Sequence, residues 1–136
     1  MISYLALGTN LGDKELNLQQ AINLIAERIG NLSAISSVYH SEPWGFESEN
    51  SFLNMVLSVD TNLSPEELLH ETQRIEKEMG RTQKSNGSYQ DRIIDIDIIL
   101  YGDLQYKSDQ LEIPHPSYRE RAFVMESLRE ILPEEN

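Results

Sequence analysis

The sequence predicts an α+β fold, because strand-like and helix-like segments follow one another in the order β, α, β, β, α, β. Segments 18–29 and 64–79 repeat apolar residues at the spacing of one helix face, and segments of strand composition lie around them. This order is typical of a ferredoxin-like sandwich, an antiparallel sheet with two helices on one face. We expect residues 1–136 to form a single domain. Its C-terminal extension includes a helix over 123–132 and lies over an edge or over the open face of the sheet.

The first half of the chain is expected to supply three strands and one helix. Residues 2–8 have strand composition, and residues 8–12 have turn composition that leads into the first helix. Gly30 is expected to stop that helix. Residues 35–40 and 52–59 are the next two strands, and in the second of them alternate residues make one fully apolar face.

The second helix has the clearest start in the sequence. Ser64 suits an N-cap, Pro65 suits the first helical position, and Glu67 suits the position that closes a capping box. Gly80 is expected to end this helix. After a polar loop, a strand over 93–101 completes the predicted sheet.

The composition excludes several classes of protein. The chain carries a formal charge of −12, which repels a phosphate backbone, so we expect no nucleic-acid partner. It contains no cysteine, which excludes disulfides and thiolate metal sites. The N-terminus lacks a basic segment and a long apolar run, so we expect no signal peptide and no membrane association. We expect a cytoplasmic monomer.

The negative charge is unevenly distributed along the chain. Between Arg81 and Arg121 there are six basic and seven acidic residues, so almost all of the net charge lies elsewhere. This region can therefore accept an anion, whereas an acidic surface by itself can simply keep the protein in solution.

Asp95 and Asp97 form the most informative pair in the sequence. On a strand with period two they share one face with Tyr101, while Ile96 and Leu100 point into the core. Their Cα atoms are then about 7 Å apart. Carboxylate oxygens suit Mg²⁺, which binds one or two carboxylates and completes its shell with phosphates and waters, so a nucleotide is expected here. The alternative is two solvated acids on an exposed strand.

Basic residues flank this pair on both sides. The loop 80–92 carries three cations among flexible residues, as a mobile phosphate clamp would, although such a loop can also be a disordered surface excursion. His115 lies between two prolines and precedes Arg119 and Arg121, so we interpret it as a phosphate ligand. A single histidine is otherwise more often structural.

A second pocket is predicted from aromatic and amide side chains. The segment 41–46 contains Trp44, and Phe52, Asn54 and Phe123 are expected near it on the open face of the sheet. Rings stack on a flat heterocycle, and an amide offers it both a donor and an acceptor. A hydrophobic patch buried by the C-terminal segment explains the same residues equally well.

Four motifs together resemble one family. They are Arg92-Ile-Ile-Asp-Ile-Asp97, Ile113-Pro-His-Pro116, Arg121-Ala-Phe123 and Gly8-Thr-Asn-Leu11, and segments 41–45, 52–54 and 73–81 fit as well. In this order and spacing they resemble 6-hydroxymethyl-7,8-dihydropterin pyrophosphokinase of folate biosynthesis, over essentially the whole chain. The resemblance implies a ferredoxin-like fold and transfer of pyrophosphate from ATP to the hydroxymethyl group of the pterin, with release of AMP.

The resemblance also implies roles for individual residues. Asp95 and Asp97 would hold two Mg²⁺ ions that bridge the triphosphate of the co-substrate ATP, and Asp97 would accept the hydroxyl proton. Arg81 and Arg92 would be the mobile catalytic cations. The residues implied to bind ATP are Gln73, Glu76, Arg81, Lys84, Arg92, Ile98, Leu111, His115 and Arg121. Those implied to bind the pterin are Ser41, Pro43, Trp44, Phe52, Asn54 and Phe123.

The chain departs from the family pattern at three points. Tyr89-Gln-Asp91 stands where many relatives have Trp-Gly-Pro or Lys-Gly-Pro before Arg92. Gln83 replaces a second arginine, and Lys84 can supply its charge but not its bidentate geometry. Glu42 stands where proline is common.

Two other functions stay open at this point. A ferredoxin-like regulatory module would bind a small ligand without turnover, but it has no need of paired aspartates and mobile arginines. Mg²⁺ dependence of nucleotide binding separates it from the enzyme. A simple kinase would transfer one phosphoryl group and release ADP in place of AMP.

Overall fold

The computed structural model describes residues 1–41, 51–80 and 93–132. The strands of its main sheet are β1 (Ile2–Thr9), β2 (Gly30–Ile35), β3 (Tyr39–Ser41), β4 (Phe52–Thr61) and β5 (Asp95–Tyr101). The α-helices are α1 (Lys14–Arg28), α2 (Pro65–Glu78) and α3 (Ala122–Ile131). Between β5 and α3 lie a small hairpin of β6 (Tyr106–Lys107) and β7 (Glu112–Ile113) and the 3₁₀ helix η1 (Tyr118–Glu120).

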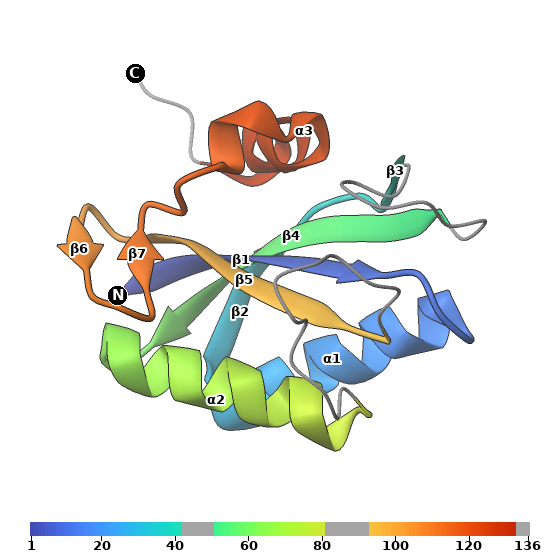
Figure 1. Cartoon of the computed structure of the whole chain (residues 1–136), viewed down its shortest axis with the longest axis horizontal. Coiled ribbons are helices and arrows are strands. Elements are labelled where there is room, and N and C mark those ends of the chain that lie inside the picture. The colour runs from blue at the N-terminus through green and yellow to red at the C-terminus, as the bar shows by residue number, and fades with distance from the viewer. Residues whose placement is uncertain (42–50, 81–92, 133–136) are drawn as a thin grey trace.

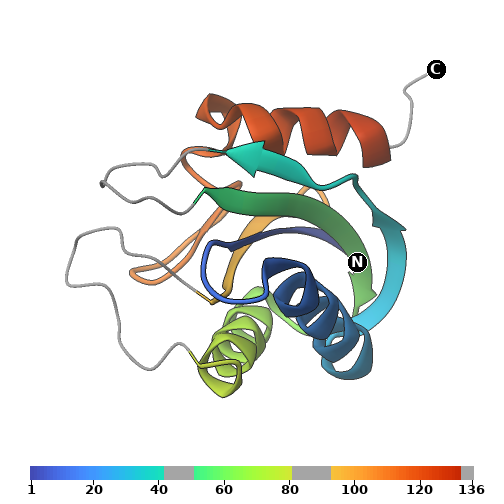
Figure 2. The same cartoon turned by 90° about the vertical axis from the view of Figure 1, so that its right-hand side faces the viewer.

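The main sheet has the topology that the sequence predicts. Its strands are all antiparallel, in the order β2-β4-β1-β5, and β3 also pairs with β4. Helices α1 and α2 cover one face and α3 covers the other (Figures 1 and 2). This arrangement confirms the ferredoxin-like sandwich, with β2 and β3 sharing the place of its second strand. In the part of the chain that is described, no helix is long and apolar enough to cross a membrane.

Capping side chains define where both covering helices begin. Asp13 accepts a hydrogen bond from the Leu16 N–H at 3.1 Å and caps α1. Ser64 and Glu67 form the predicted capping box of α2, with hydrogen bonds of 2.9 and 3.2 Å. Gly80 follows α2 at a φ of +113°, which confirms it as the end of that helix.

The predicted role of Gly30 needs correction. Helix α1 ends at Ile29, whose backbone is right-handed, and Gly30 begins β2. A Cβ at position 30 would lie 2.0 Å from the carbonyl oxygen of Asp60 on β4. Glycine is therefore needed for the close approach of two strands and not for a left-handed turn.

The predicted strand over 35–40 was wrong in its bounds, because β2 already begins at Gly30 and ends at Ile35, and β3 begins only at Tyr39. Ser36 is buried, and its N–H donates to the Val56 carbonyl at 2.9 Å, while its hydroxyl accepts from the Val56 N–H at 2.9 Å. A side-chain oxygen thus replaces a backbone acceptor at this point. The chain leaves the ladder for residues 36–38 and returns to it as β3.

Strand β5 follows the predicted alternation only as far as Ile99. The register to β1 shifts between Tyr4 and Leu5, and this bulge adds one residue to β5 at position 99. After the bulge the faces exchange, so Tyr101 lies in the core under α1 and α2, and Leu100 packs on the side of α3. The predicted orientations of Leu100 and Tyr101 were therefore wrong, because a bulge breaks period two.

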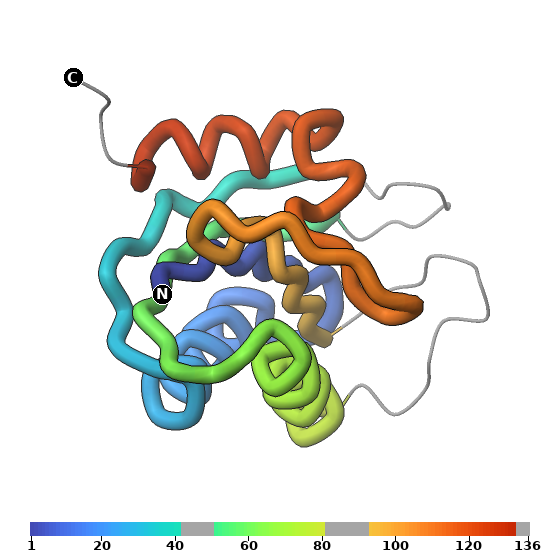
Figure 3. The backbone as a smooth tube through the Cα atoms, turned by 90° about the vertical axis from the view of Figure 1, so that its left-hand side faces the viewer, coloured from blue at the N-terminus to red at the C-terminus, as the bar shows by residue number. Residues whose placement is uncertain are grey.

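The sheet has a hydrophobic core on each side. The larger core lies under α1 and α2 and contains Leu5, Leu57 and Ile75, each fully buried. The smaller one joins Val56 and Ile99 of the sheet to α3. Burial of a side chain of this size contributes about 1.5–3 kcal/mol. The C-terminal extension thus covers the open face, which the chain reaches from β5 by way of β6 and β7 (Figure 3).

Candidate active site

The two aspartates lie on the edge strand β5, on the sheet face that α3 covers. Asp95 pairs with Gly8 of β1, and Asp97 pairs with Ala6, which belongs to the core under α3. Both carboxylates are half-buried. This placement confirms the prediction that they share one face.

These two carboxylates can bind Mg²⁺ only together with oxygens from a bound phosphate compound and water. Among the described residues, no group of three or more His, Cys, Asp or Glu side chains is arranged to hold a metal ion. Two carboxylates without a third protein ligand are the donor set from which Mg²⁺ makes a shell completed by phosphate and water oxygens. Asp95 and Asp97 are the residues that would hold such an ion.

Arg121 supplies the positive charge that the acidic pair requires. Its Nη1 donates to Asp97 Oδ2 at 3.2 Å, and the two side chains are 24% and 27% exposed. Arg121 occupies the N-cap position of α3, so the start of that helix brings the guanidinium over β5. The sequence predicted both residues for the site, and the structure brings them into contact.

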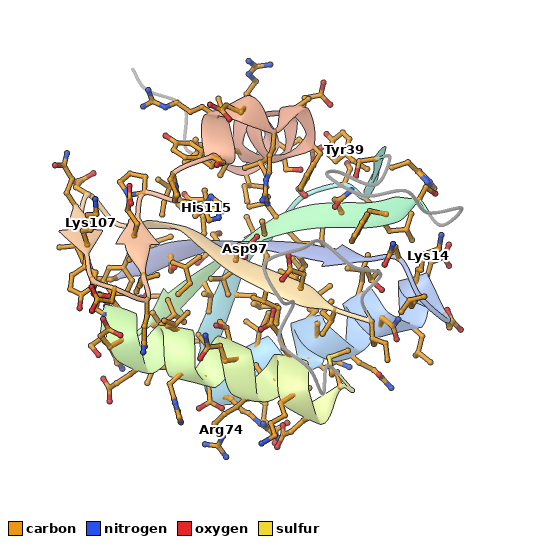
Figure 4. The ribbon with its side chains drawn as sticks, in the orientation of Figure 1. Lys14, Tyr39, Arg74, Asp97, Lys107 and His115 are labelled. Carbon is orange, nitrogen blue, oxygen red and sulfur yellow. The ribbon has the colours of Figure 1, made fainter. Side chains whose placement is uncertain are left out.

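His115 lies near Asp97 (Figure 4). Its backbone N–H donates to the carbonyl of Ile99, the bulge residue, at 3.0 Å. Its Nδ1 accepts from the Ser117 N–H at 3.2 Å. Burial lowers the pKa of His115, and Arg121 lowers it further, while Asp95 and Glu112 raise it. At neutral pH the ring is therefore uncharged and carries its proton on Nε2, where it can donate to an oxygen.

Asn54 lies on the same sheet face, on the other side of β1. It is 3% exposed, and its Nδ2 donates to Ser41 Oγ at 2.7 Å and to the Tyr39 carbonyl at 3.3 Å. Because both amide protons are used, the amide contributes its oxygen to any ligand. This is a sharper role than the sequence predicted, which allowed a donor as well as an acceptor.

Gly8 is a site residue that the sequence reasoning missed. The sequence predicts that the first strand ends and a turn begins at Gly8, but β1 continues to Thr9 and places Gly8 between Asn54 of β4 and Asp95 of β5. A Cβ at position 8 would lie 3.1 Å from Asn54 Oδ1 and 3.5 Å from Phe52 Cδ1. A glycine inside a strand often marks such a close approach, and that was the available signal.

Two aromatic rings lie on elements that border this region. Phe52 begins β4 next to Gly8, and Phe123 lies in the first turn of α3, where it packs partly against the smaller core. Both side chains are half-buried. Phe123 therefore joins the C-terminal packing and keeps an exposed part, and the stacking role of both rings stays a prediction.

Comparison with known proteins identifies the family. Residues 4–133 match the family described as 7,8-dihydro-6-hydroxymethylpterin-pyrophosphokinase. The chain belongs to this family.

Relatives of this pyrophosphokinase family are similar over nearly the whole chain. Two proteins named 2-amino-4-hydroxy-6-hydroxymethyldihydropteridine pyrophosphokinase come from Porphyromonas gingivalis and Bacillus subtilis. The first is 48% identical over 134 residues, which are 97% of this chain and 91% of the relative. The second is 41% identical over 131 residues, which are 96% of this chain and 77% of the relative.

Solved structures of longer chains contain the same fold. One is a crystal structure of HPPK-DHPS in complex with substrates, with a TM-score of 0.73 and 16% identity. Another is Plasmodium falciparum HPPK-DHPS, with a TM-score of 0.73 and 18% identity. Each comparison covers 99% of this chain and 40% of the solved chain. At these identities the likeness shows the fold alone.

Four residues that the family resemblance assigns to ATP do not lie beside Asp97 and Arg121 in one cluster, but differ from one another in burial and contacts. Gln73 is exposed on α2. The side chains of Ile98 and Leu111 pack in the larger core. Glu76 is 7% exposed, and its Oε2 accepts from the Ile96 N–H at 2.8 Å. Glu76 thus ties α2 to the peptide between the two aspartates, a contact that the sequence did not predict.

The remaining predicted site residues lie outside the described part of the chain. They are Pro43, Trp44, Arg81, Lys84 and Arg92, together with the family departures at Glu42, Gln83 and 89–91. Their predicted roles stay predictions.

Proposed function

We propose that this protein transfers pyrophosphate from ATP to the hydroxymethyl group of 6-hydroxymethyl-7,8-dihydropterin and releases AMP, as one step of folate biosynthesis. The observation that carries the proposal is the shared sheet face, on which Gly8 separates the acidic pair of β5 from the buried amide of β4. Family membership and relatives at 41–48% identity support it. Nothing in these comparisons favours a regulatory module without turnover.

Residues around β5 hold the triphosphate. Asp95 and Asp97 would bind two Mg²⁺ ions, which when bound neutralise charge on the phosphates and the leaving AMP. Arg121 already lies 3.2 Å from Asp97 and is placed to bind a phosphate oxygen. His115 donates from Nε2 to another. Arg81, Lys84 and Arg92 supply the further positive charge that phosphoryl transfer requires.

The adenosine part of ATP lies between β5 and α2. Gln73 is exposed on α2 and offers an amide to it. Ile98 and Leu111 contact the nucleoside through backbone groups, because their side chains are in the core. Glu76 fixes the backbone between the two aspartates, since its carboxylate accepts a hydrogen bond from the Ile96 N–H.

Residues around β4 hold the pterin. Asn54 Oδ1 accepts a hydrogen bond from an N–H at the edge of the heterocycle. Phe52 and Phe123 stack on its faces, and Ser41, Pro43 and Trp44 form the rim. Gly8 leaves room for the ring, because its Cα carries no side chain over the sheet.

The reaction is a single displacement between these two halves. The pterin hydroxyl oxygen bonds to the β-phosphorus, the bond from that phosphorus to the oxygen of AMP breaks, and the hydroxyl proton passes to a carboxylate. Asp97 is the proposed acceptor of the proton. The protein contributes mainly orientation and charge stabilisation.

Nucleotide chromatography tests this function. The protein is mixed with ATP, Mg²⁺ and the pterin, and we expect AMP that forms only when the pterin and Mg²⁺ are both present. Formation of ADP would show a simple kinase and contradict the proposal. Absence of turnover with tight Mg·ATP binding would favour the regulatory module. A cytoplasmic location and a monomeric state stay predictions.

A further inference from the structure

One carboxylate of α3 holds the interrupted part of the sheet edge. Glu130 Oε2 accepts from the Ser37 N–H at 2.8 Å and from the Ser37 hydroxyl at 3.1 Å. Glu130 Oε1 accepts from the Tyr39 hydroxyl. Tyr39 is the first residue of β3, and it lies beside α3 (Figure 4). Three donors from one short segment therefore converge on a single side chain near the end of α3.

This contact lies where the chain leaves the sheet ladder. Ser36, just after β2, makes the last pair of hydrogen bonds to β4 before the interruption, both with Val56. In residues 36–38, the Ser37 N–H donates to Glu130 where a strand would supply a backbone partner. Glu130 therefore sets the path by which the chain reaches β3.

Strand β3 in turn orients the amide of Asn54. Tyr39 pairs with Asn54 in the register of β3 and β4, and its carbonyl accepts one amide proton at 3.3 Å. Ser41, two residues later on β3, accepts the other at 2.7 Å. The direction of Asn54 Oδ1 thus depends on where β3 lies.

We propose that Glu130 is a positioning residue for the pterin half of the site, because it holds β3 in the place from which Tyr39 and Ser41 orient Asn54. The inference rests on the proposed function. Glu130 itself lies on the exposed side of α3. It acts through β3 on Asn54, whereas Asp95 and Asp97 on β5 have separate neighbours.

The ionised form of Glu130 is the one that makes this contact. Hydrogen bonds from Tyr39 and Ser37 lower the pKa of Glu130, and the hydrogen bond to Glu130 raises the pKa of the Tyr39 phenol. The carboxylate is therefore a pure acceptor at neutral pH. Glutamine at this position has the same length but no charge, and its NH₂ group cannot accept from any of the three donors.

Steady-state kinetics of E130Q test the proposal. We expect the KM for the pterin to rise about fivefold to tenfold, as expected from the loss of one charge-assisted hydrogen bond, while kcat and the KM for ATP stay within twofold. Glu126 is the matched control, because it lies one turn earlier on α3, is exposed and accepts no hydrogen bond among those described. E126Q is expected to leave both KM values unchanged.

A measurement without substrates separates this proposal from the proposed function. We expect the side-chain ¹⁵N–¹H₂ signals of Asn54 to shift in E130Q and in Y39F, and to stay in place in E126Q. The proposal is overturned by an unchanged Asn54 signal with an unchanged pterin KM. It is also overturned if E130Q lowers kcat and raises both KM values together, because that pattern shows a general effect on folding. The signals of Asn54 report on positioning even if AMP is never formed.

Discussion

Asp97 and Asn54 lie on the same sheet face, on opposite sides of β1, but different interactions hold them. Asp97 is on the edge strand, half-buried, and paired with the guanidinium of Arg121. Asn54 is on an interior strand, 3% exposed, and fixed by two hydrogen bonds from its amide. The proposed nucleotide half of the site, around Asp95, Asp97 and Arg121, is therefore organised by charge. The proposed pterin half, around Asn54, is organised by packing and hydrogen bonds.

The acidic half is expected to give the largest functional effect at the smallest structural cost. We expect D95N and D97N each to lower AMP formation by about 10³-fold, since removal of one preorganised electrostatic group has effects of that order. Folding is expected to survive, because asparagine keeps the size of the aspartate side chain and its amide oxygen can still accept a hydrogen bond. AMP assays and thermal unfolding check both statements.

Asp103 is the control for this experiment, since it is an exposed acid just after β5. D103N is expected to keep full activity. If D95N or D97N unfolded at the assay temperature, or if either variant kept its activity, the result would contradict the claim that the acidic pair serves catalysis and not folding.

A methyl group at Gly8 is expected to affect the pterin half first. In G8A the new Cβ would lie 3.1 Å from Asn54 Oδ1, closer than an ordinary contact, so the amide has to shift. We expect the KM for the pterin to rise about tenfold, because small displacements of a binding group cost affinity strongly. The KM for ATP, measured in the same preparation, is the internal control. An equal rise in both values would show that Gly8 serves the whole sheet.

Removal of Arg121 tests whether charge organises the part of the site around Asp97. We expect R121A to raise the KM for ATP about tenfold and to leave the KM for the pterin within twofold, because a charged hydrogen bond to phosphate contributes about 1.5–3 kcal/mol. Arg119 is the matched control, since it contacts the Tyr118 ring and hydroxyl and not the acids. If R119A had the same effect as R121A, general positive charge and not the Asp97 contact would explain binding.

The smallest expected effect concerns pH and His115. Burial and Arg121 lower the folded pKa of His115 below its unfolded value of 6.5. Between these two pKa values the unfolded chain binds more protons, so stability falls as the pH drops below 6.5. The expected result is a small loss of the free energy of unfolding toward acidic pH. Urea unfolding at pH 7.5 and pH 5.5 measures it, and H115Q is expected to lose this contribution. An unchanged pH dependence in H115Q would contradict the assignment.

Local patterns in the sequence predicted much of this architecture. Helical spacing and the Ser64 capping box depend on residues a few positions apart, and both are confirmed. The shared face of Asp95 and Asp97 follows from strand period alone. It held because the bulge of β5 comes after them, at position 99.

Features that depend on two distant segments were not predictable in the same way. The place of Gly8 between Asn54 and Asp95 requires the register of three strands. The Gly30 contact with Asp60 and the Ser36 contact with Val56 require the same information. Glu130 carries no local signal, because its partners lie more than 90 residues earlier in the chain. In the candidate site, residue types were predictable, but the contacts between them were not.

Steady-state kinetics of N54A test the central claim most directly, that two separately held halves meet across Gly8. The variant removes the amide of β4 and leaves the acids, Arg121 and His115 in place. We predict that the KM for the pterin rises about tenfold or more while the KM for Mg·ATP stays within twofold. A rise of equal size in both KM values would contradict the account, because it would show that one connected network and not two separate halves binds the substrates.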